Sequence, residues 1–276
     1  MENKAECDLE ATILRKLSEP RHSHRHLISL LATYEQNGSY YLIFPWAGAD
    51  LRDYWKNINP KPRHDTETIM WLAEQCLGLA SGLAKIHRYQ TLSSSALLQA
   101  SSPGKTQTET VRTAMGPDSA PKEENMKILF GRHGDIKPTN ILWFPKGPER
   151  DKEILKITDF GISRFTTVNS VSARERGRAP NSPTYRPPEW DLPHPIISTS
   201  YDIWTLGCVY LEFIAWYLGG FVYLQEFEQR RLAPDFDWVG VSCDTFFTVE
   251  SRGSSAPIPK VKPAVTEVRL FQVLEI

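Results

Sequence analysis

The sequence predicts an α+β fold, on the evidence of two kinds of segment. Helical periodicity, with apolar residues three or four positions apart, marks residues 2–18 and 65–87, and an unusually apolar helix is expected over 201–217. Short runs rich in β-forming residues predict strands at 39–44, 127–130, 141–144 and 154–158. We therefore expect a few small groups of strands beside a mainly helical part.

Two local signals place the boundaries of these elements. Asn37-Gly38 precedes the run SYYLIF and is typical of a hairpin turn, so we expect a strand pair near 28–44. Asp65 has a side chain that can cap the helix running to about His87.

The composition is that of an ordinary globular chain. Hydrophobic residues make up 41% and charged residues 24% of the 276 positions, and the net charge is -1. This charge balance predicts no nucleic-acid partner. Four cysteines without a CxxC pair, and an N-terminus without an apolar run, favour reduced thiols in a cytoplasmic or nuclear protein.

One segment, from Leu206 to Leu224, is long and apolar enough to cross a membrane. Glu212 lies in its middle, where a charge is costly in lipid, and we expect Gly219-Gly220 to end the helix. A fully buried core helix explains the same pattern, and we prefer that interpretation. No membrane partner is expected.

Residues 90–126 differ from the rest of the chain. They are mostly Ser, Thr, Gln, Pro, Gly and charged residues, with almost no aromatic side chain. Such a composition cannot bury enough apolar area to offset the entropy lost on ordering. We predict a disordered insertion here.

Two motifs carry chemistry: the run HGDIKPTN from His133 to Asn140, and Asp159-Phe160-Gly161 shortly after it. Together they resemble the catalytic loop H-R-D-x-K-x-x-N and the metal-binding D-F-G of eukaryotic protein kinases. Each motif alone is weak evidence, because an Asp after a strand is usually a turn or cap residue. The order of the motifs gives the resemblance its weight.

The resemblance implies a role for each residue, and the residue types suit these roles. Asp135 would be the catalytic carboxylate near the attacking hydroxyl, and Lys137 the cation at the moving phosphate. Asn140 and Asp159 would hold Mg²⁺, which requires oxygen ligands. Strands at 141–144 and 154–158 would form the hairpin that brings these two residues together.

Further motifs follow the order of the same family. Tyr185-Arg186-Pro187-Pro188-Glu189 resembles the A-P-E box, and the run YDIWTLG from Tyr201 resembles the opening of the buried helix. The run LIFPWA, from 42 to 47, resembles the strand and hinge that hold adenine. The residues implied to bind ATP are Phe44 as gatekeeper, Pro45 and Ala47 through their backbone, Asp50 at the ribose and Leu142 beneath the adenine. Glu10 falls where the regulatory helix carries its glutamate.

The sequence also departs from the family pattern. Gly134 replaces the arginine of H-R-D, which puts control through a phosphate on the activation loop in doubt. H-G-D is also similar to aminoglycoside and choline-type phosphotransferases, which act on small molecules. Lys137, the D-F-G set and the Pro187-Pro188-Glu189 box favour protein substrates, and Lys137 in particular is typical of the serine/threonine branch. Neither a Gly-rich loop nor a V-A-I-K lysine precedes Glu10, and Glu189 is expected to lack its usual arginine partner.

These features predict a partial small lobe and a mainly helical large lobe. The expected division is a small-lobe remnant at 1–47, the large lobe at 48–224 and a divergent tail at 225–276. The resemblance, which covers about residues 2–222, implies a serine/threonine protein kinase that uses ATP and Mg²⁺ on protein substrates. We expect poor turnover from the truncated chain, and a pseudokinase-like interaction module or a small-molecule phosphotransferase are the alternatives. The sequence gives no indication of oligomeric state.

His22, His24 and His26 alternate along the chain and could suggest a metal site. Their spacing does not fit one helix face and no cysteine joins them, so a solvated or capping role is preferred.

Overall fold

The N-terminal part of the fold is a helix followed by a hairpin. The computed structural model describes residues 4–37, 39–91, 127–148, 152–160, 164–166, 172–173, 182–192, 196–234, 242–250 and 257–268. Helix α1 (Lys4–Leu17) packs through Ile13, Leu14 and Leu17, and strands β1 (Ala32–Gln36) and β2 (Ser39–Ile43) pair antiparallel. Asn37 has a φ of 52°, which asparagine tolerates in tight hairpin turns. The predicted helix and strand pair are both confirmed.

The middle of the chain is dominated by one long helix. Strand β3 (Ala49–Asp50), helix α2 (Leu51–Asp53) and the π-helical turn η1 (Tyr54–Ile58) lead into α3 (Thr66–His87). The Asp65 carboxylate accepts a hydrogen bond from the backbone N–H of Thr68 at 2.9 Å, so it caps α3 as predicted.

Strand β4 (Tyr89–Thr91) corrects the start of the predicted insertion. It pairs with β5 (Lys127–Arg132), which in turn pairs with β8 (Arg164–Thr166). Residues 90 and 91 are therefore part of a sheet, because their backbone groups find partners on β5. Residues 92–126, the rest of the segment predicted to be disordered, lie outside the described residues.

The hairpin predicted beside the catalytic loop is present. Strand β6 (Ile141–Phe144) pairs antiparallel with β7 (Ile154–Ile157), and β3 pairs with the other edge of β6. The 3-10 turn η2 (Pro138–Asn140) leads directly into β6. The pairing of Ile141 with Ile157 sets the ends of both strands, and the residues beyond them, next to each other.

The segment before the last long helix is irregular. Strands β9 (Ser172–Ala173) and β10 (Ile196–Ile197) form a short pair. Two 3-10 turns lie between them in sequence, η3 (Pro183–Tyr185) and η4 (Pro188–Asp191). In each turn a proline occupies one of the first helical positions, where its missing N–H costs no hydrogen bond.

Helix α5 (Ser200–Arg231) does not end at the glycine pair, contrary to expectation. Gly219 and Gly220 leave helical geometry, and Gly220 adopts a φ of 72°, but a second helical segment follows at once. The carbonyl of Pro60 accepts a hydrogen bond from the Phe221 N–H at 2.8 Å. The loop before α3 thus supplies a partner where the helix is broken, and the helix continues to Arg231.

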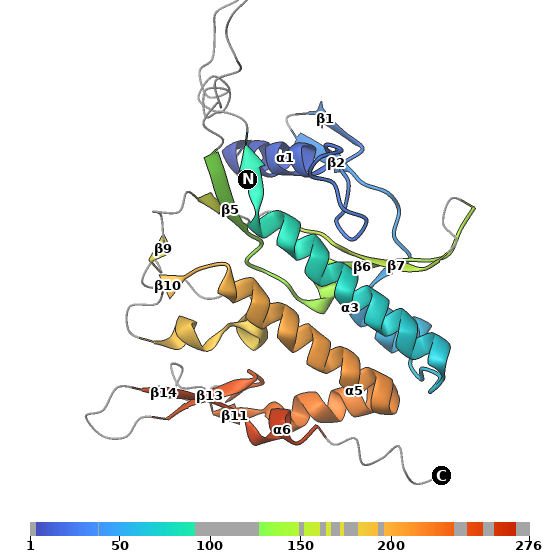
Figure 1. The fold of residues 1–276 in the computed structure, drawn as a ribbon, viewed down its shortest axis with the longest axis vertical. Helices are drawn as coiled ribbons and strands as arrows, with labels where there is room; N and C mark the ends of the chain where they lie inside the picture. The colour runs from blue at the N-terminus through green and yellow to red at the C-terminus, as the bar shows by residue number, and fades with distance from the viewer. Residues whose placement is uncertain are drawn as a thin grey trace, which may run out of the picture.

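The C-terminal region beyond α5 is folded against that helix. Its described elements are β11 (Ala233–Pro234), β12 (Ser242–Cys243), β13 (Phe247–Glu250), β14 (Ile258–Val261) and the short helix α6 (Pro263–Thr266). Strands β11 and β12 pair, as do β13 and β14. Figure 1 shows α5 between α3 above and the β13–β14 hairpin below.

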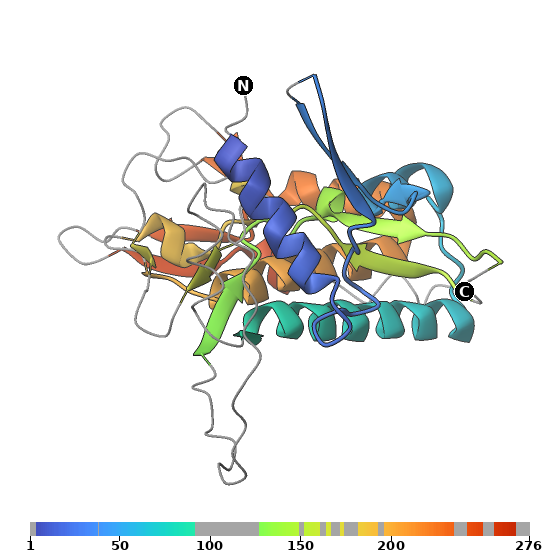
Figure 2. The same cartoon turned by 90° about the horizontal axis from the view of Figure 1, so that it is seen from above.

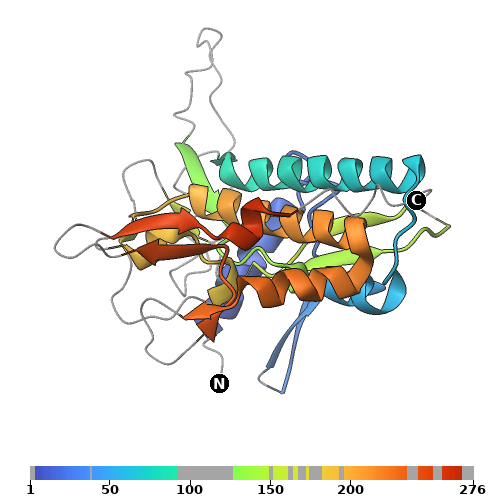
Figure 3. The ribbon, with the colours of Figure 1, turned by 90° about the horizontal axis from the view of Figure 1, so that it is seen from below.

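A single core cluster joins these layers. It extends from α1 through α3 and the β6–β7 hairpin to α5, and includes Trp55, Phe213 and Trp216 in mutual ring contact. Seen from above, α1 crosses the molecule while α3 runs along one edge (Figure 2). Seen from below, the bend in α5 and the adjoining hairpin are both visible (Figure 3).

The charged residue in the middle of α5 is buried within the protein. By length and composition α5 could cross a membrane, yet Glu212 is 0% exposed and pairs with Arg231 at 3.0 Å. The Tyr185 hydroxyl donates a second hydrogen bond to the carboxylate of Glu212 at 2.8 Å. An arginine and a tyrosine satisfying this carboxylate are what the preferred core-helix interpretation requires.

The bend in α5 generates the first prediction. A Cβ at Gly220 would lie 2.4 Å from the Pro60 carbonyl oxygen, and the positive φ strains any L side chain. We expect Gly220→Ala to lower the free energy of unfolding by roughly 2 kcal/mol or more in urea titrations followed by circular dichroism. The control is Gly207→Ala, in the same helix with open space around it, which should raise stability by about 0.5–1 kcal/mol. Equal effects of the two substitutions would contradict this account.

A second prediction concerns pH. Burial raises the pKa of the Glu212 carboxyl to about 7 from 4.5, although Arg231 and Tyr185 act in the opposite direction. The folded chain thus binds this proton more tightly than the unfolded chain. The free energy of unfolding should therefore fall as the pH rises from 4.5 to about 7. Glu212→Gln should flatten that slope in urea titrations at several pH values, whatever it does to absolute stability. An unchanged slope would rule out Glu212 as its source.

Candidate active site

The catalytic loop is held in place by one buried carboxylate. Asp202, at the start of α5, accepts hydrogen bonds from the backbone N–H groups of His133 and Gly134, both at 2.8 Å. His87, the last residue of α3, contacts the same carboxylate at 2.9 Å. Asp202 is 0% exposed, so these contacts take place away from water. The loop is therefore anchored to the two longest helices.

Gly134 has a conformation that suits its residue type. Its φ is 86°, in the left-handed region where a side chain adds strain. The glycine that departs from the H-R-D pattern thus lets the loop pass over Asp202 without that cost.

The His133 ring connects the loop to the Asp159 segment. Its Nδ1 accepts from the Asp135 N–H at 3.2 Å, and its Nε2 lies 2.9 Å from the carbonyl oxygen of Thr158. A neutral ring with its proton on Nε2 satisfies both contacts. The ring also meets Phe160 edge-on, with 5.1 Å between centroids. The two motifs are thus in direct contact.

Two predicted catalytic residues, Lys137 and Asn140, contact the carboxylate of the third, Asp135. Lys137 Nζ lies 2.7 Å from Asp135 Oδ2, and the Asn140 amide nitrogen lies 3.0 Å from the same oxygen. Asn140 also donates to the Asp135 backbone carbonyl at 2.9 Å. The other carboxylate oxygen, Oδ1, accepts a hydrogen bond from the Ser182 hydroxyl at 2.5 Å. Both oxygens of Asp135 are thus oriented by neighbours.

Ser182 and Asp202 were missed by the sequence assignment. The Ser182 hydroxyl lies 3.0 Å from Lys137 Nζ and also donates to Asp135 Oδ1. It therefore lies between the Asp135 carboxylate and the Lys137 ammonium group. Asp202 lies within the matched motif YDIWTLG, which could have drawn attention to it, but its partners lie 68 and 69 residues away.

Asp159 lies at the end of β7, next to Asn140. The Thr158 N–H donates to the Asn140 carbonyl at 3.0 Å, and Asp159 follows with a φ of 64°. This left-handed conformation is strained for a residue other than glycine and is tolerated best by Asn and Asp. Asp159 is exposed. The hairpin therefore brings together the two predicted oxygen ligands.

The predicted ATP-binding residues lie on adjoining elements. Phe44 and Ala47 are half-buried against the core, as is Leu142, whose backbone pairs with Asp50. Pro45 is also half-buried. The Asp50 carboxylate accepts from the Asp53 N–H at 2.8 Å and caps α2, a structural role that the sequence analysis did not include. Its contact with a ribose stays a prediction.

Glu10 lies half-buried on α1, beside the residues through which that helix packs. Its predicted role as the regulatory glutamate stays a prediction.

The three alternating histidines have structural contacts. His24 Nδ1 accepts from the backbone N–H of His26 at 3.2 Å, which is a local capping contact. The His26 ring is buried over Gly78 of α3, and this burial lowers its pKa to about 4. The ring is therefore neutral at pH 7.

The donor set fits Mg²⁺ held jointly with a nucleotide. Nδ2 of Asn140 is engaged with Asp135, while its Oδ1 has no donor among the described residues. An amide oxygen and a carboxylate at one hairpin end are hard ligands, and Mg²⁺ usually completes its shell with waters and substrate phosphates.

Comparison with known proteins agrees with this geometry. The family model for the protein kinase domain matches residues 127–225, a range that runs from β5 into the second half of α5. Over these residues the chain is similar to the protein kinase domain. Protein kinases use ATP and Mg²⁺, and their fold combines helices and strands as this chain does.

Several curated proteins that are named as kinases are similar to the chain. Cyclin-dependent kinase 2 of Caenorhabditis elegans is 24% identical over 215 residues, which are 76% of this chain and 44% of that protein. Cyclin-dependent kinase B1-1 of Arabidopsis thaliana is 37% identical over 82 residues, 30% and 24% of the two chains. The alpha subunit of the CTD kinase of Schizosaccharomyces pombe is 40% identical over 80 residues, which are 29% of this chain and 12% of that protein. The chain thus spans less than half the length of these relatives.

One expected departure from the kinase pattern can be examined directly. Among the described residues, Glu189 of the P-P-E box has no ion-pair partner, and its carboxylate accepts a long hydrogen bond of 3.5 Å from Ser200. Arg186 pairs instead with Asp191 at 2.9 Å, and Arg231 pairs with Glu212. The segment before α5 is therefore anchored through residues other than Glu189.

The Asp202 contacts generate a third prediction. An amide cannot accept from both backbone N–H groups, so Asp202→Asn leaves one of them facing another donor. We expect the free energy of unfolding to fall by about 1.5–3 kcal/mol and the His133 and Gly134 amides to exchange faster with deuterium. Urea titration and exchange mass spectrometry measure the two effects. Glu226→Gln, on the exposed face of α5, is the control, and full protection of the loop in Asp202→Asn would disprove the anchoring role.

Proposed function

We propose that this chain transfers the γ-phosphoryl group of ATP to serine or threonine hydroxyls of proteins. The observation that carries the proposal is a hydroxyl, that of Ser182, lying between a carboxylate and an ammonium group, Asp135 and Lys137. An acceptor side chain in the same place would have its base and its charge-stabilising cation at hydrogen-bond distance.

The proposed reaction assigns one task to each side chain. The oxygen of the acceptor hydroxyl forms a bond to the γ-phosphorus of ATP, and the bond between that phosphorus and the ADP oxygen breaks. Asp135 takes the proton that the hydroxyl loses. Lys137 stabilises the negative charge on the transferred group, a contribution that depends on its fixed position. Asn140 and Asp159 would hold Mg²⁺, which when bound neutralises phosphate charge.

The nucleotide would lie along the chain connecting β2 to β3. Phe44 would limit the depth of the adenine site, with the backbone of Pro45 and Ala47 as hydrogen-bonding groups and Leu142 beneath the ring. Asp50 could serve a ribose and cap α2 at once, because a carboxylate has two oxygens. Glu10 would face the nucleotide site from α1. These assignments rest on the resemblance to protein kinases and on the neighbouring positions of the elements.

The proposed setting is the cytoplasm or nucleus, with protein substrates. Cys76, Cys208 and Cys243 are free thiols, as expected in a reducing compartment. Lys137 favours serine and threonine acceptors, in agreement with the names of the relatives.

The fourth prediction tests nucleotide binding. We expect ATP to bind the chain more tightly with Mg²⁺ than without, and Asp159→Ala to weaken the Mg²⁺-dependent binding by roughly tenfold or more. Isothermal titration calorimetry with and without Mg²⁺ measures both effects, with Glu226→Ala as a matched surface control.

A radiometric transfer assay with a serine peptide then separates binding from chemistry. Asp135→Asn should retain ATP binding and lose transfer, because the amide cannot accept the proton. Equal transfer by wild type and Asp135→Asn would exclude Asp135 as the base, and equal ATP binding by wild type and Asp159→Ala would remove Asp159 from the site.

A further inference from the structure

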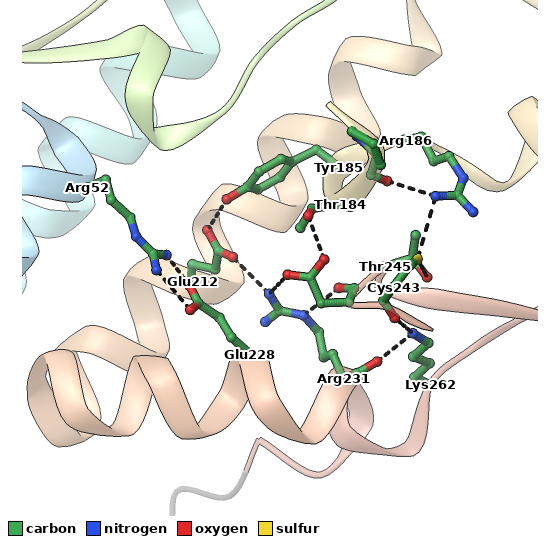
Figure 4. Close-up of polar contacts among 12 residues, drawn as sticks. Arg52, Thr184, Tyr185, Arg186, Glu212, Glu228, Arg231, Cys243, Thr245 and Lys262 are labelled. Atoms are coloured by element: carbon green, nitrogen blue, oxygen red, sulfur yellow. Dashed lines mark hydrogen bonds and ion pairs between the residues drawn. The ribbon is translucent and has the colours of Figure 1, made fainter. Parts of the chain in front are cut away.

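The C-terminal region contacts the segment next to the catalytic residues through three consecutive side chains. Thr184 Oγ1 donates to Asp244 Oδ1 at 2.6 Å. The Tyr185 ring lies 6.2 Å from that of Phe246, and Arg186 lies 3.6 Å from Cys243 Sγ, with its guanidinium over Phe247. Residues 243–247, here called the 243–247 turn, therefore lie against residues 184–186 (Figure 4).

The 243–247 turn is itself held firmly. The Arg231 Nε donates to the Asp244 carbonyl at 3.0 Å, and the buried Lys262 Nζ donates to the carbonyls of Cys243 and Arg231. Thr245 is 3% exposed and closes the turn by donating to the Phe247 carbonyl at 2.8 Å. These bonds use backbone carbonyls, and the second carboxylate oxygen of Asp244, Oδ2, also lies 4.0 Å from the Arg231 guanidinium. Thr184→Val, which leaves that ion pair in place, is therefore the variant that isolates the Thr184–Asp244 hydrogen bond.

The opposite side of residues 184–186 faces α5. The Tyr185 hydroxyl donates to Glu212, whose other oxygen pairs with Arg231, and Figure 4 shows this chain of contacts. The segment is thus enclosed between α5 and the 243–247 turn. Its freedom to move depends on both.

Movement at Thr184 would be passed on to the catalytic carboxylate. Thr184 lies two residues after Ser182, within the single turn η3, which is closed by the Tyr185 N–H donating to the Ser182 carbonyl at 3.2 Å. The Ser182 hydroxyl in turn donates a hydrogen bond to Asp135 Oδ1 and accepts one from Lys137 Nζ. A short rigid turn therefore connects Asp244 to Asp135.

We propose that Asp244 is a positioning residue, which holds Thr184 and through it keeps the Ser182 hydroxyl on Asp135. The C-terminal region would then determine how well the catalytic carboxylate is oriented. This inference rests on the proposed function for its kinetic consequence, but its structural part can be tested without turnover.

The structural test is hydrogen–deuterium exchange of the full chain. Asp244→Ala and Thr184→Val remove the hydrogen bond from either side, and we expect about tenfold faster exchange of the amides of residues 184–186 in both. Asp244→Asn keeps an acceptor and Thr184→Ser keeps a donor, so both variants should retain most of the protection of these amides from exchange. Glu250→Ala, which removes an exposed pair with Lys260 on the neighbouring β13–β14 hairpin, is the matched control. Unchanged protection of residues 184–186 in Thr184→Val would overturn the inference.

The kinetic test separates positioning from general destabilisation. Asp244→Ala should lower kcat for peptide phosphorylation severalfold while leaving the KM for ATP unchanged, and Asp244→Asn should restore kcat. A fall in melting temperature with no change in kcat would assign Asp244 a structural role only, which overturns the proposal. Absence of transfer in the wild type would refute the proposed function, whereas the exchange result would still decide whether Asp244 holds this segment.

Discussion

The site depends on a carboxylate that takes no part in the chemistry. In the predicted catalytic loop between β5 and η2, Asp202 supplies acceptors for two backbone N–H groups. Because Asp202 begins α5, the orientation of Asp135, Lys137 and Asn140 follows the placement of that helix. Burial of the three contacts makes them costly to lose, since an unpaired N–H away from water has no substitute.

Local signals made much of the fold predictable. The Asn37-Gly38 hairpin, the Asp65 cap and the β6–β7 hairpin depend on residues a few positions apart, and all three are present as expected. The candidate catalytic residues could be predicted because their motif is contiguous. Long-range polar partners were not predictable, because nothing near Asp202 in the sequence identifies the loop that it holds.

The fold of the C-terminal region was also not predictable from local sequence. The sequence predicts only a divergent tail at 225–276, whereas the structure has paired strands there, whose buried residues include Phe247 and Val249. Each strand is too short for alternation to stand out, and the turn between β12 and β13 is fixed by Arg231 and Lys262 from elsewhere. The helix also continued past Gly219 and Gly220 because the distant Pro60 carbonyl supplied a hydrogen bond, which no helix-stop rule could anticipate.

The environment of Arg231 has a consequence for ionic strength. Its guanidinium lies between the rings of Phe227 and Phe246, at 4.2 and 4.1 Å, and its ion pair with Glu212 is 0% and 1% exposed. Dissolved ions screen exposed charges such as Arg230 and Glu226 strongly but screen a buried pair much less. The Glu212–Arg231 pair connects the two halves of α5, so salt should change little the position of Arg231, whose Nε donates to the Asp244 carbonyl of the C-terminal region.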